Sequence, residues 1–129
     1  MKINIEGFPG ISSEVLSVNG VEIIRVDLND YNGERFDELL EFMGILFRSK
    51  PLDSVRLITV MHNTTPMLTD KDIFSRYLQK NRPHIRASAY CGFPQLLLPL
   101  MKSALNFSGR DDIKFFEDET DAVIWLVST

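Results

Sequence analysis

Segments with strand-like and helix-like patterns alternate along this chain, and that alternation constrains the fold more than any other feature. Runs rich in β-branched and large apolar residues predict strands, whereas apolar residues spaced three and four apart predict helices. The predicted order is β-β-α-β-α-β-α-β-α. Because helical crossovers join parallel strands, we predict an α/β fold with a mixed, mostly parallel sheet of four to five strands, an N-terminal antiparallel hairpin and about four helices.

The hairpin is expected at residues 14–28, because two strand-like runs flank Asn19-Gly20, the dipeptide that best tolerates a two-residue turn. Further strands are expected at residues 54–61, 84–91 and 113–116. Helices are expected at residues 34–49, from an N-cap at Thr69 to Pro83, at 95–107 and at 119–127, the last with Ala122, Val123 and Leu126 facing inward. We place residues 1–129 in a single domain and expect residues 1–13 to form a docked arm.

Composition and charge narrow the class of protein. Fourteen Lys and Arg residues against 18 Asp and Glu residues give a net charge of -4 and a pI near 5.1, which argues against nucleic-acid binding as the main role. No stretch approaches the roughly 18 apolar residues of a membrane span. Cys91 is the only cysteine, and the first residues lack the apolar core of a signal peptide. We therefore expect a cytoplasmic protein.

Four segments resemble the small SpoIIAA-like proteins, relatives of the STAS domain with a further likeness to the CRAL-TRIO lipid-binding fold. They read VEIIRVDLNDYNGE at 21–34, SVRLITVMHNT at 54–64, KNRPHIRASAYCGF at 80–93 and SGRDDIKFFEDETDAVIWL at 108–126. The last segment is the most specific, because Phe116-Glu117 precedes an acidic helix start and an Ala-x-x-Trp-Leu motif. The resemblance covers about residues 14–127 and implies this α/β fold, a bacterial cytoplasmic setting and no established enzymatic activity.

The anti-sigma-factor antagonists of this family carry a phosphorylatable serine after a central strand, in an Asp-Ser-Ser-Gly context. The matching segment here reads His62-Asn63-Thr64-Thr65-Pro66, without that aspartate, either serine or the glycine. Thr64 and Thr65 are therefore the candidate phosphorylation sites. A phosphate near a helix N-terminus would favour docking of a basic partner.

Two loops that follow neighbouring parallel strands form the predicted binding site, since ligands of open α/β sheets favour the carboxyl ends of the strands. The 62–69 loop and the 91–94 loop supply the candidate ligand- or partner-binding residues His62, Asn63, Thr64, Thr65, Cys91, Gly92 and Phe93. The alternative is that both loops are ordinary turns, in which Asn and Thr cap helices and Phe93 belongs to the core.

We expect no enzymatic activity. His62 could act as a general base and Cys91 as a nucleophile, but no carboxylate is clearly placed to orient the imidazole. His62, His84 and Cys91 lack metal-ligand spacing, and no phosphate- or dinucleotide-binding glycine motif occurs. The sequence therefore predicts neither a metal nor a cofactor.

Two further patterns bear on partners. Basic residues, Arg76 among them, predominate at 71–86 and acidic residues at 27–41, an asymmetry that could steer an acidic partner or a lipid headgroup, or reflect only solvated helix faces. The apolar arc of residues 95–107 spans about 200°, more than one sheet contact needs. It favours packing against a neighbouring helix, a homodimer contact or a lining for an apolar ligand. We expect Pro99 to bend this helix.

Together these features predict a non-enzymatic binding or regulatory module that contacts a regulatory protein partner through the 62–69 loop and Arg76. The alternative is a carrier or sensor of an apolar or anionic, lipid-like small molecule, with Phe93 and the leucine-rich helix as its wall. We expect neither a nucleic-acid partner nor a membrane span.

Overall fold

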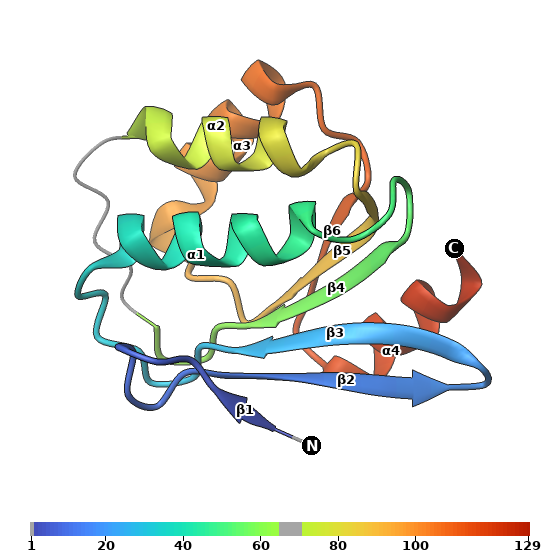
Figure 1. The fold of residues 1–129 in the computed structure, drawn as a ribbon. Helices are drawn as coiled ribbons and strands as arrows, with labels where there is room; N and C mark the ends of the chain where they lie inside the picture. The colour runs from blue at the N-terminus through green and yellow to red at the C-terminus, as the bar shows by residue number, and fades with distance from the viewer. Residues whose placement is uncertain (1, 65–70) are drawn as a thin grey trace.

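A computed structural model describes residues 2–64 and 71–129 of the chain. Its strands and helices alternate as the sequence predicts (Figure 1). The strands are β1 (Ile3–Asn4), β2 (Ser12–Val18), β3 (Val21–Asp27), β4 (Val55–Val60), β5 (Ile85–Cys91) and β6 (Ile113–Phe116). The helices are α1 (Phe36–Arg48), α2 (Lys71–Asn81), the short 3-10 helix η1 (Gln95–Leu97), α3 (Leu98–Ser108) and α4 (Glu119–Ser128).

The strands form one six-stranded sheet in the order β1-β2-β3-β4-β5-β6. The β1–β2 and β2–β3 pairs are antiparallel, and the three pairs from β3 to β6 are parallel. Asn19 and Gly20 join β2 to β3 with φ angles of 51° and 78°, the left-handed values that a two-residue hairpin turn needs. The mixed, mostly parallel α/β class is confirmed, with β1 as a strand beyond the four to five expected.

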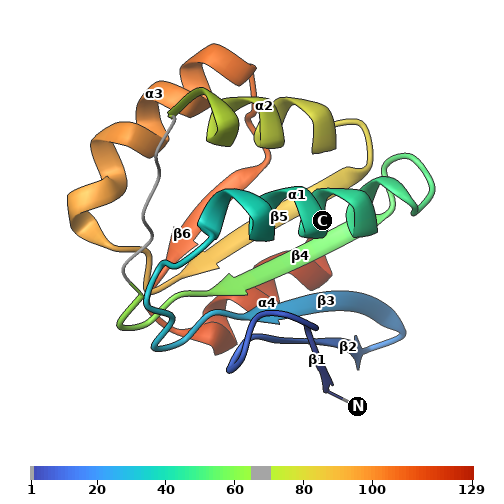
Figure 2. The same ribbon diagram turned by 60° about the vertical axis from the view of Figure 1, so that its left-hand side comes forward.

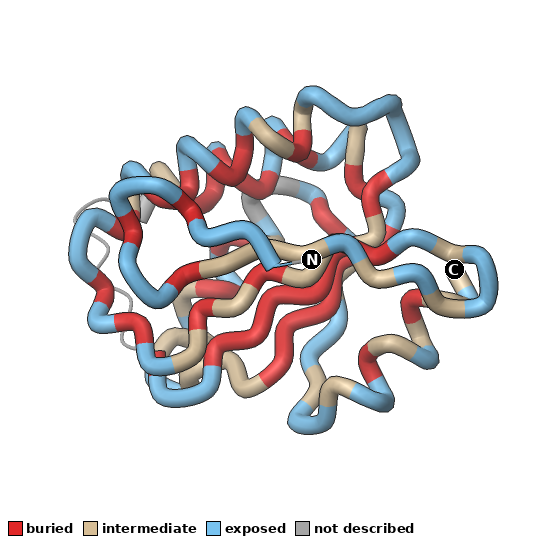
Figure 3. Tube along the Cα trace, turned by 60° about the horizontal axis from the view of Figure 1, so that its bottom comes forward, coloured by how far each residue is buried: buried red, intermediate tan, exposed pale blue. Residues whose placement is uncertain are grey.

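Helices cover both faces of the sheet unequally. α1, α2 and α3 lie over one face, and α4 lies over the other (Figures 1 and 2). Because right-handed crossovers that progress in one direction place their helices on the same face, the order β3-β4-β5-β6 keeps α1 to α3 together. The larger core lies beneath these three helices. A smaller core joins α4 to the central strands, whose residues are largely buried (Figure 3).

The N-terminal segment docks on the domain as an arm. β1 pairs with β2, and Ile5, Phe8 and Ile11 belong to the larger core. Arg35, which precedes α1, holds this arm in place. Its guanidinium lies 4.7 Å from the centre of the Phe8 ring and donates a hydrogen bond to the Gly7 carbonyl at 2.9 Å.

The leucine-rich segment forms two helices, so the expectation of one bent helix is wrong. Pro99 lies in the first turn of α3, where a missing N–H removes no intrahelical hydrogen bond. Pro99 therefore begins α3 instead of bending it. α3 contacts α2, with Met101 and Ala104 buried, so packing against a neighbouring helix explains part of the apolar arc.

The remaining helices agree with the sequence where they can be compared. In α4, Ala122 and Leu126 are fully buried and Val123 is half-buried, as expected. The predicted N-cap at Thr69 lies outside the described residues. None of the helices within the described ranges is long and apolar enough to cross a membrane.

Candidate functional site

The carboxyl ends of the four parallel strands meet at one edge of the sheet, and backbone hydrogen bonds join the loops that follow them. The amide of Leu28 donates to the Val60 carbonyl at 2.8 Å, and the amide of Met61 donates to the Cys91 carbonyl at 2.8 Å. The amide of Gly92 donates to the carbonyl of Phe116 in β6 at 3.1 Å. The pairing of the sheet therefore extends into the loops and fixes their relative positions.

His62 occupies the centre of this edge. Its backbone amide donates to Asn29 Oδ1 at 2.8 Å, and its carbonyl accepts a hydrogen bond from the Asp30 amide at 2.9 Å. The imidazole ring lies directly against the α-carbon of Gly92, so that a Cβ at residue 92 would overlap the ring. Gly92 also has a φ angle of 69°, which L side chains rarely adopt. Glycine is thus required here both for the backbone and for the histidine.

A hollow of about 470 Å³ opens beside this histidine. We call it the carboxyl-edge pocket; its lining comes from the ends of β4, β5 and β6 and from the start of the leucine-rich segment: His62, Gly92, Phe93, Gln95, Leu98, Phe115, Phe116 and Glu117. Three phenylalanines and Leu98 are its apolar side chains, and one imidazole, one amide and one carboxylate are its polar side-chain groups.

The aromatic wall of the pocket is packed by rings on both sides of the sheet. The Phe93 and Phe115 rings meet edge to face with centroids 5.4 Å apart, and both contact the buried ring of Tyr90. On the other face, the Phe116 ring lies 5.8 Å from that of Trp125 in α4. Since packed rings lose little further conformational freedom on binding, this wall is preorganised for an aromatic or apolar ligand.

The structure brings together three of the predicted site residues, since His62, Gly92 and Phe93 all line the carboxyl-edge pocket. Asn63 is exposed beside them, in the left-handed region with a φ angle of 57°. Thr64 is buried, and its hydroxyl donates to the Leu28 carbonyl. A kinase would have to break that contact to reach Thr64. Thr65 lies outside the described residues.

Cys91 and Arg76 lie away from this pocket. The Cys91 side chain is fully buried in the core on the α4 face. Burial raises the pKa of its thiol to about 11, so the thiol is protonated near neutral pH and is a poor nucleophile. Arg76 lies on α2 at a second hollow. Neither residue forms a unit with His62.

Phe115, Phe116 and Glu117 line the pocket but were not predicted as site residues, whereas Gln95 and Leu98 belong to the leucine-rich segment that was expected as a wall for an apolar ligand. Phe115 and Phe116 stand at the carboxyl end of a predicted parallel strand, so the rule that selected the first two loops also applies to them. Gln95 and Leu98 follow Phe93 closely. Only the strand order, which places β6 beside β5, shows that these segments share one pocket.

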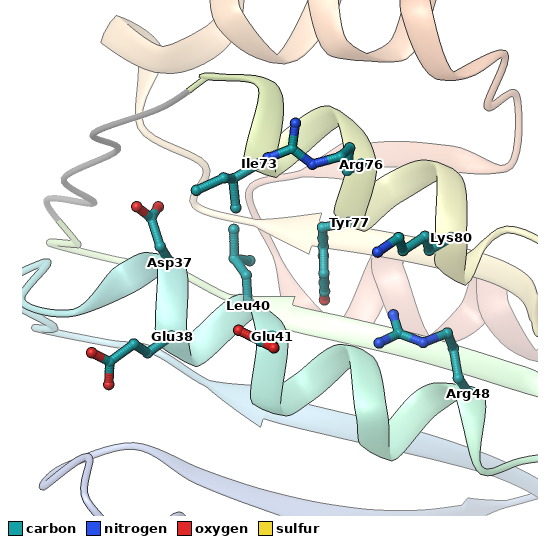
Figure 4. A pocket seen from close by; sticks show the side chains of 9 residues that line it. All are labelled: Asp37, Glu38, Leu40, Glu41, Arg48, Ile73, Arg76, Tyr77 and Lys80. Atoms are coloured by element: carbon teal, nitrogen blue, oxygen red, sulfur yellow. The ribbon is translucent and has the colours of Figure 1, made fainter.

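A second hollow, of about 350 Å³, lies between α1 and α2. We call it the α1–α2 groove; Figure 4 shows its lining: Asp37, Glu38, Leu40, Glu41, Arg48, Ile73, Arg76, Tyr77 and Lys80. The acidic segment and the basic segment recognised in the sequence therefore face each other across a single groove. Arg76 belongs to this groove.

Within residues 2–64 and 71–129, no group of three His, Cys, Asp or Glu side chains is arranged to hold a metal ion. Comparison of the chain with protein families, with curated proteins and with solved structures finds no match to any of them.

Proposed function

We propose that the protein is a non-enzymatic binding module that holds a small molecule in the carboxyl-edge pocket. The observation that carries this proposal is the hollow of about 470 Å³ beside Phe93, a volume within the range of about 300 to 1,000 Å³ of small-molecule sites. It occurs at the sheet edge where open α/β folds bind ligands. The buried, protonated Cys91 supports a binding role over nucleophilic catalysis.

The lining of the pocket defines the class of ligand. An aromatic or apolar body matches Phe93, Phe115 and Phe116. A hydrogen-bond donor or ammonium group on that body matches the Glu117 carboxylate and the rings around it, because a cation is attracted to both. We therefore propose a small aromatic or apolar molecule with a polar donor group, which differs in that group from the apolar or anionic, lipid-like ligand that the sequence offers as an alternative.

The test is a titration of the ¹⁵N-labelled protein with phenethylamine, followed through the backbone amide signals of the pocket. The account predicts saturable shifts centred on Gly92, Phe93 and Phe116, and weaker binding of 2-phenylethanol, which keeps the ring but lacks the charge. Phe93→Ala should weaken binding about tenfold, which corresponds to about 1.4 kcal/mol. Leu96→Ala is the matched control, because Leu96 belongs to the same segment, is 96% exposed and does not line the pocket. Shifts scattered over the surface, or equal binding by both variants, would contradict the proposal.

A regulatory protein partner is the second function that we propose, because large apolar side chains are exposed in the pocket wall and in the segment that contributes to it. Leu96 is 96% exposed and Phe115 is 39% exposed, and exposed apolar patches commonly mark interaction surfaces. The Leu96→Ala variant also distinguishes the two functions. It should retain phenethylamine binding under both, but it should lose a co-purifying partner only if the partner contacts this edge.

A further inference from the structure

The α1–α2 groove is lined by both acidic and basic side chains. Asp37 and Glu41 stand on the N-terminal half of α1, whereas Arg48 and Lys80 stand toward the C-terminal ends of the two helices (Figure 4). The apolar part of the lining consists of Leu40, Ile73 and Tyr77, of which Ile73 is half-buried and the other two are buried. Basic side chains therefore stand at the C-terminal end of the groove, while Glu41 and Arg76 lie beside its apolar lining (Figure 4).

Three of these charges form no ion pair with another residue among those that the structure describes. Glu38 pairs with Arg35 at 2.5 Å, but among residues 2–64 and 71–129 no ion pair involves Glu41, Arg48 or Lys80. Glu41 and Arg48 are seven residues apart on one helix, which separates them by about 10 Å along its axis. That distance is too long for a direct ion pair.

The Arg48 guanidinium is held in position at the basic end. Its Nη1 donates to Asn81 Oδ1 at 2.9 Å, and Asn81 is only 2% exposed. The guanidinium also lies against the bare backbone of Gly44, where a Cβ would come within 2.6 Å of Nη1. A favourable interaction with the helix dipole would explain why a basic residue occurs in the last turn of α1. That interaction alone would not need a glycine at residue 44 or a buried asparagine at residue 81. The arrangement instead orients the remaining N–H donors of Arg48.

We propose that the α1–α2 groove binds a short peptide with free termini. The C-terminal carboxylate would accept hydrogen bonds from Arg48 and an ion pair from Lys80, and the N-terminal ammonium would pair with Glu41. Its side chains would pack against Ile73, the half-buried apolar residue of the lining. About three extended residues, at roughly 3.3 to 3.6 Å each, span the distance of about 10 Å between Glu41 and Arg48. The groove shares no lining residue with the carboxyl-edge pocket, so this inference is independent of the proposed function.

The test compares the tripeptide Ala-Leu-Ala with its N-acetylated and C-amidated forms by isothermal titration calorimetry and by NMR. Each capped form should bind at least about tenfold more weakly than the free peptide, since each lacks one charged end. Equal binding of the three peptides would overturn the proposal, as would binding of the free peptide elsewhere on the protein.

Two variants assign the ends of the peptide. Gly44→Ala should displace the Arg48 guanidinium and weaken binding of the free peptide. The helix itself should gain stability, because alanine is the better helix former. Ile45→Ala is the matched control, because Ile45 is on the same helix, 61% exposed and outside the groove lining. Glu41→Gln should lower the affinity for the free peptide to that for the acetylated peptide. The affinity for the acetylated peptide should stay unchanged. Full binding by both Gly44→Ala and Glu41→Gln would overturn the assignment.

Discussion

Gly92 couples the backbone of the β5 loop to the side chain of His62. Its φ angle of 69° is in the left-handed region, and its missing Cβ leaves room for the imidazole ring. Two physical requirements therefore coincide at one residue of the carboxyl-edge pocket. Gly20 separates the two requirements, since it has a left-handed φ angle of 78° but no atom within 4 Å of where its Cβ would be.

Gly20→Ala should cost only the left-handed backbone penalty, about 1 to 2 kcal/mol of the free energy of unfolding. Gly92→Ala should cost that penalty and also displace the His62 ring, so its loss in urea denaturation should be the larger of the two. The side-chain NMR signals of His62 should shift in Gly92→Ala and stay in place in Gly20→Ala. Equal losses with unmoved His62 signals would show that the ring does not depend on this glycine.

At the level of residues, the sequence predicts the part of the site that follows from strand ends. His62, Gly92 and Phe93 come directly after predicted parallel strands, so their proximity could be inferred from the pattern alone. The orientation of a side chain at a strand end could not be inferred in the same way. Cys91 is the last residue of β5 and faces the α4 core, because successive side chains of a strand point to opposite faces.

Two arginines of the sheet hold α4 at both ends. Arg25 on β3 donates to both carboxylate oxygens of Glu119, at 2.7 and 3.2 Å, and this contact helps hold the pKa of Arg25 above its ordinary value. Arg56 on β4 donates to the carbonyls of Leu126 at 3.1 Å and Thr129 at 2.6 Å. Because α4 is the only described helix on its face, these contacts supplement its apolar core.

Glu119→Gln should therefore lower the free energy of unfolding by about 1 kcal/mol, a modest value because the Glu119 side chain is 39% exposed. Asp121→Asn is the control, since it removes the same charge from the first turn of α4 without touching Arg25. Urea denaturation should show the larger loss for Glu119→Gln, and 0.5 M salt should narrow the difference, because salt screens exposed charges. Equal losses of unfolding free energy at low salt would show that Glu119 stabilises α4 only through the helix dipole and not through Arg25.

At the level of elements, the hydrophobic spacing predicts the larger helices and strands, because burial of one face imposes that spacing. It cannot predict the contact between Arg25 and Glu119, which are 94 residues apart. The division of the leucine-rich segment into η1 and α3 depends on which turn contains Pro99. The apolar pattern, which continues through Leu96, Leu97 and Leu98, does not mark that boundary.

At the scale of the whole molecule, alternation of strands and helices predicts a mostly parallel sheet, and the crossover rule explains why three helices share one face. The complete strand order is settled only by the structure, and it alone brings β6 into the pocket. The resemblance to SpoIIAA-like proteins stays a prediction, as do phosphorylation at Thr64 or Thr65 and a homodimer contact through residues 95–107.

The central claim, that the carboxyl-edge pocket holds a small molecule, is tested most directly by native mass spectrometry of protein purified from its own cells. The experiment compares the wild type with Leu98→Trp, in which a larger side chain fills the pocket, after circular dichroism has shown that both are folded. The account predicts a small organic adduct on the wild type and a bare chain for Leu98→Trp. A bare wild type, or the same adduct on both proteins, would contradict it.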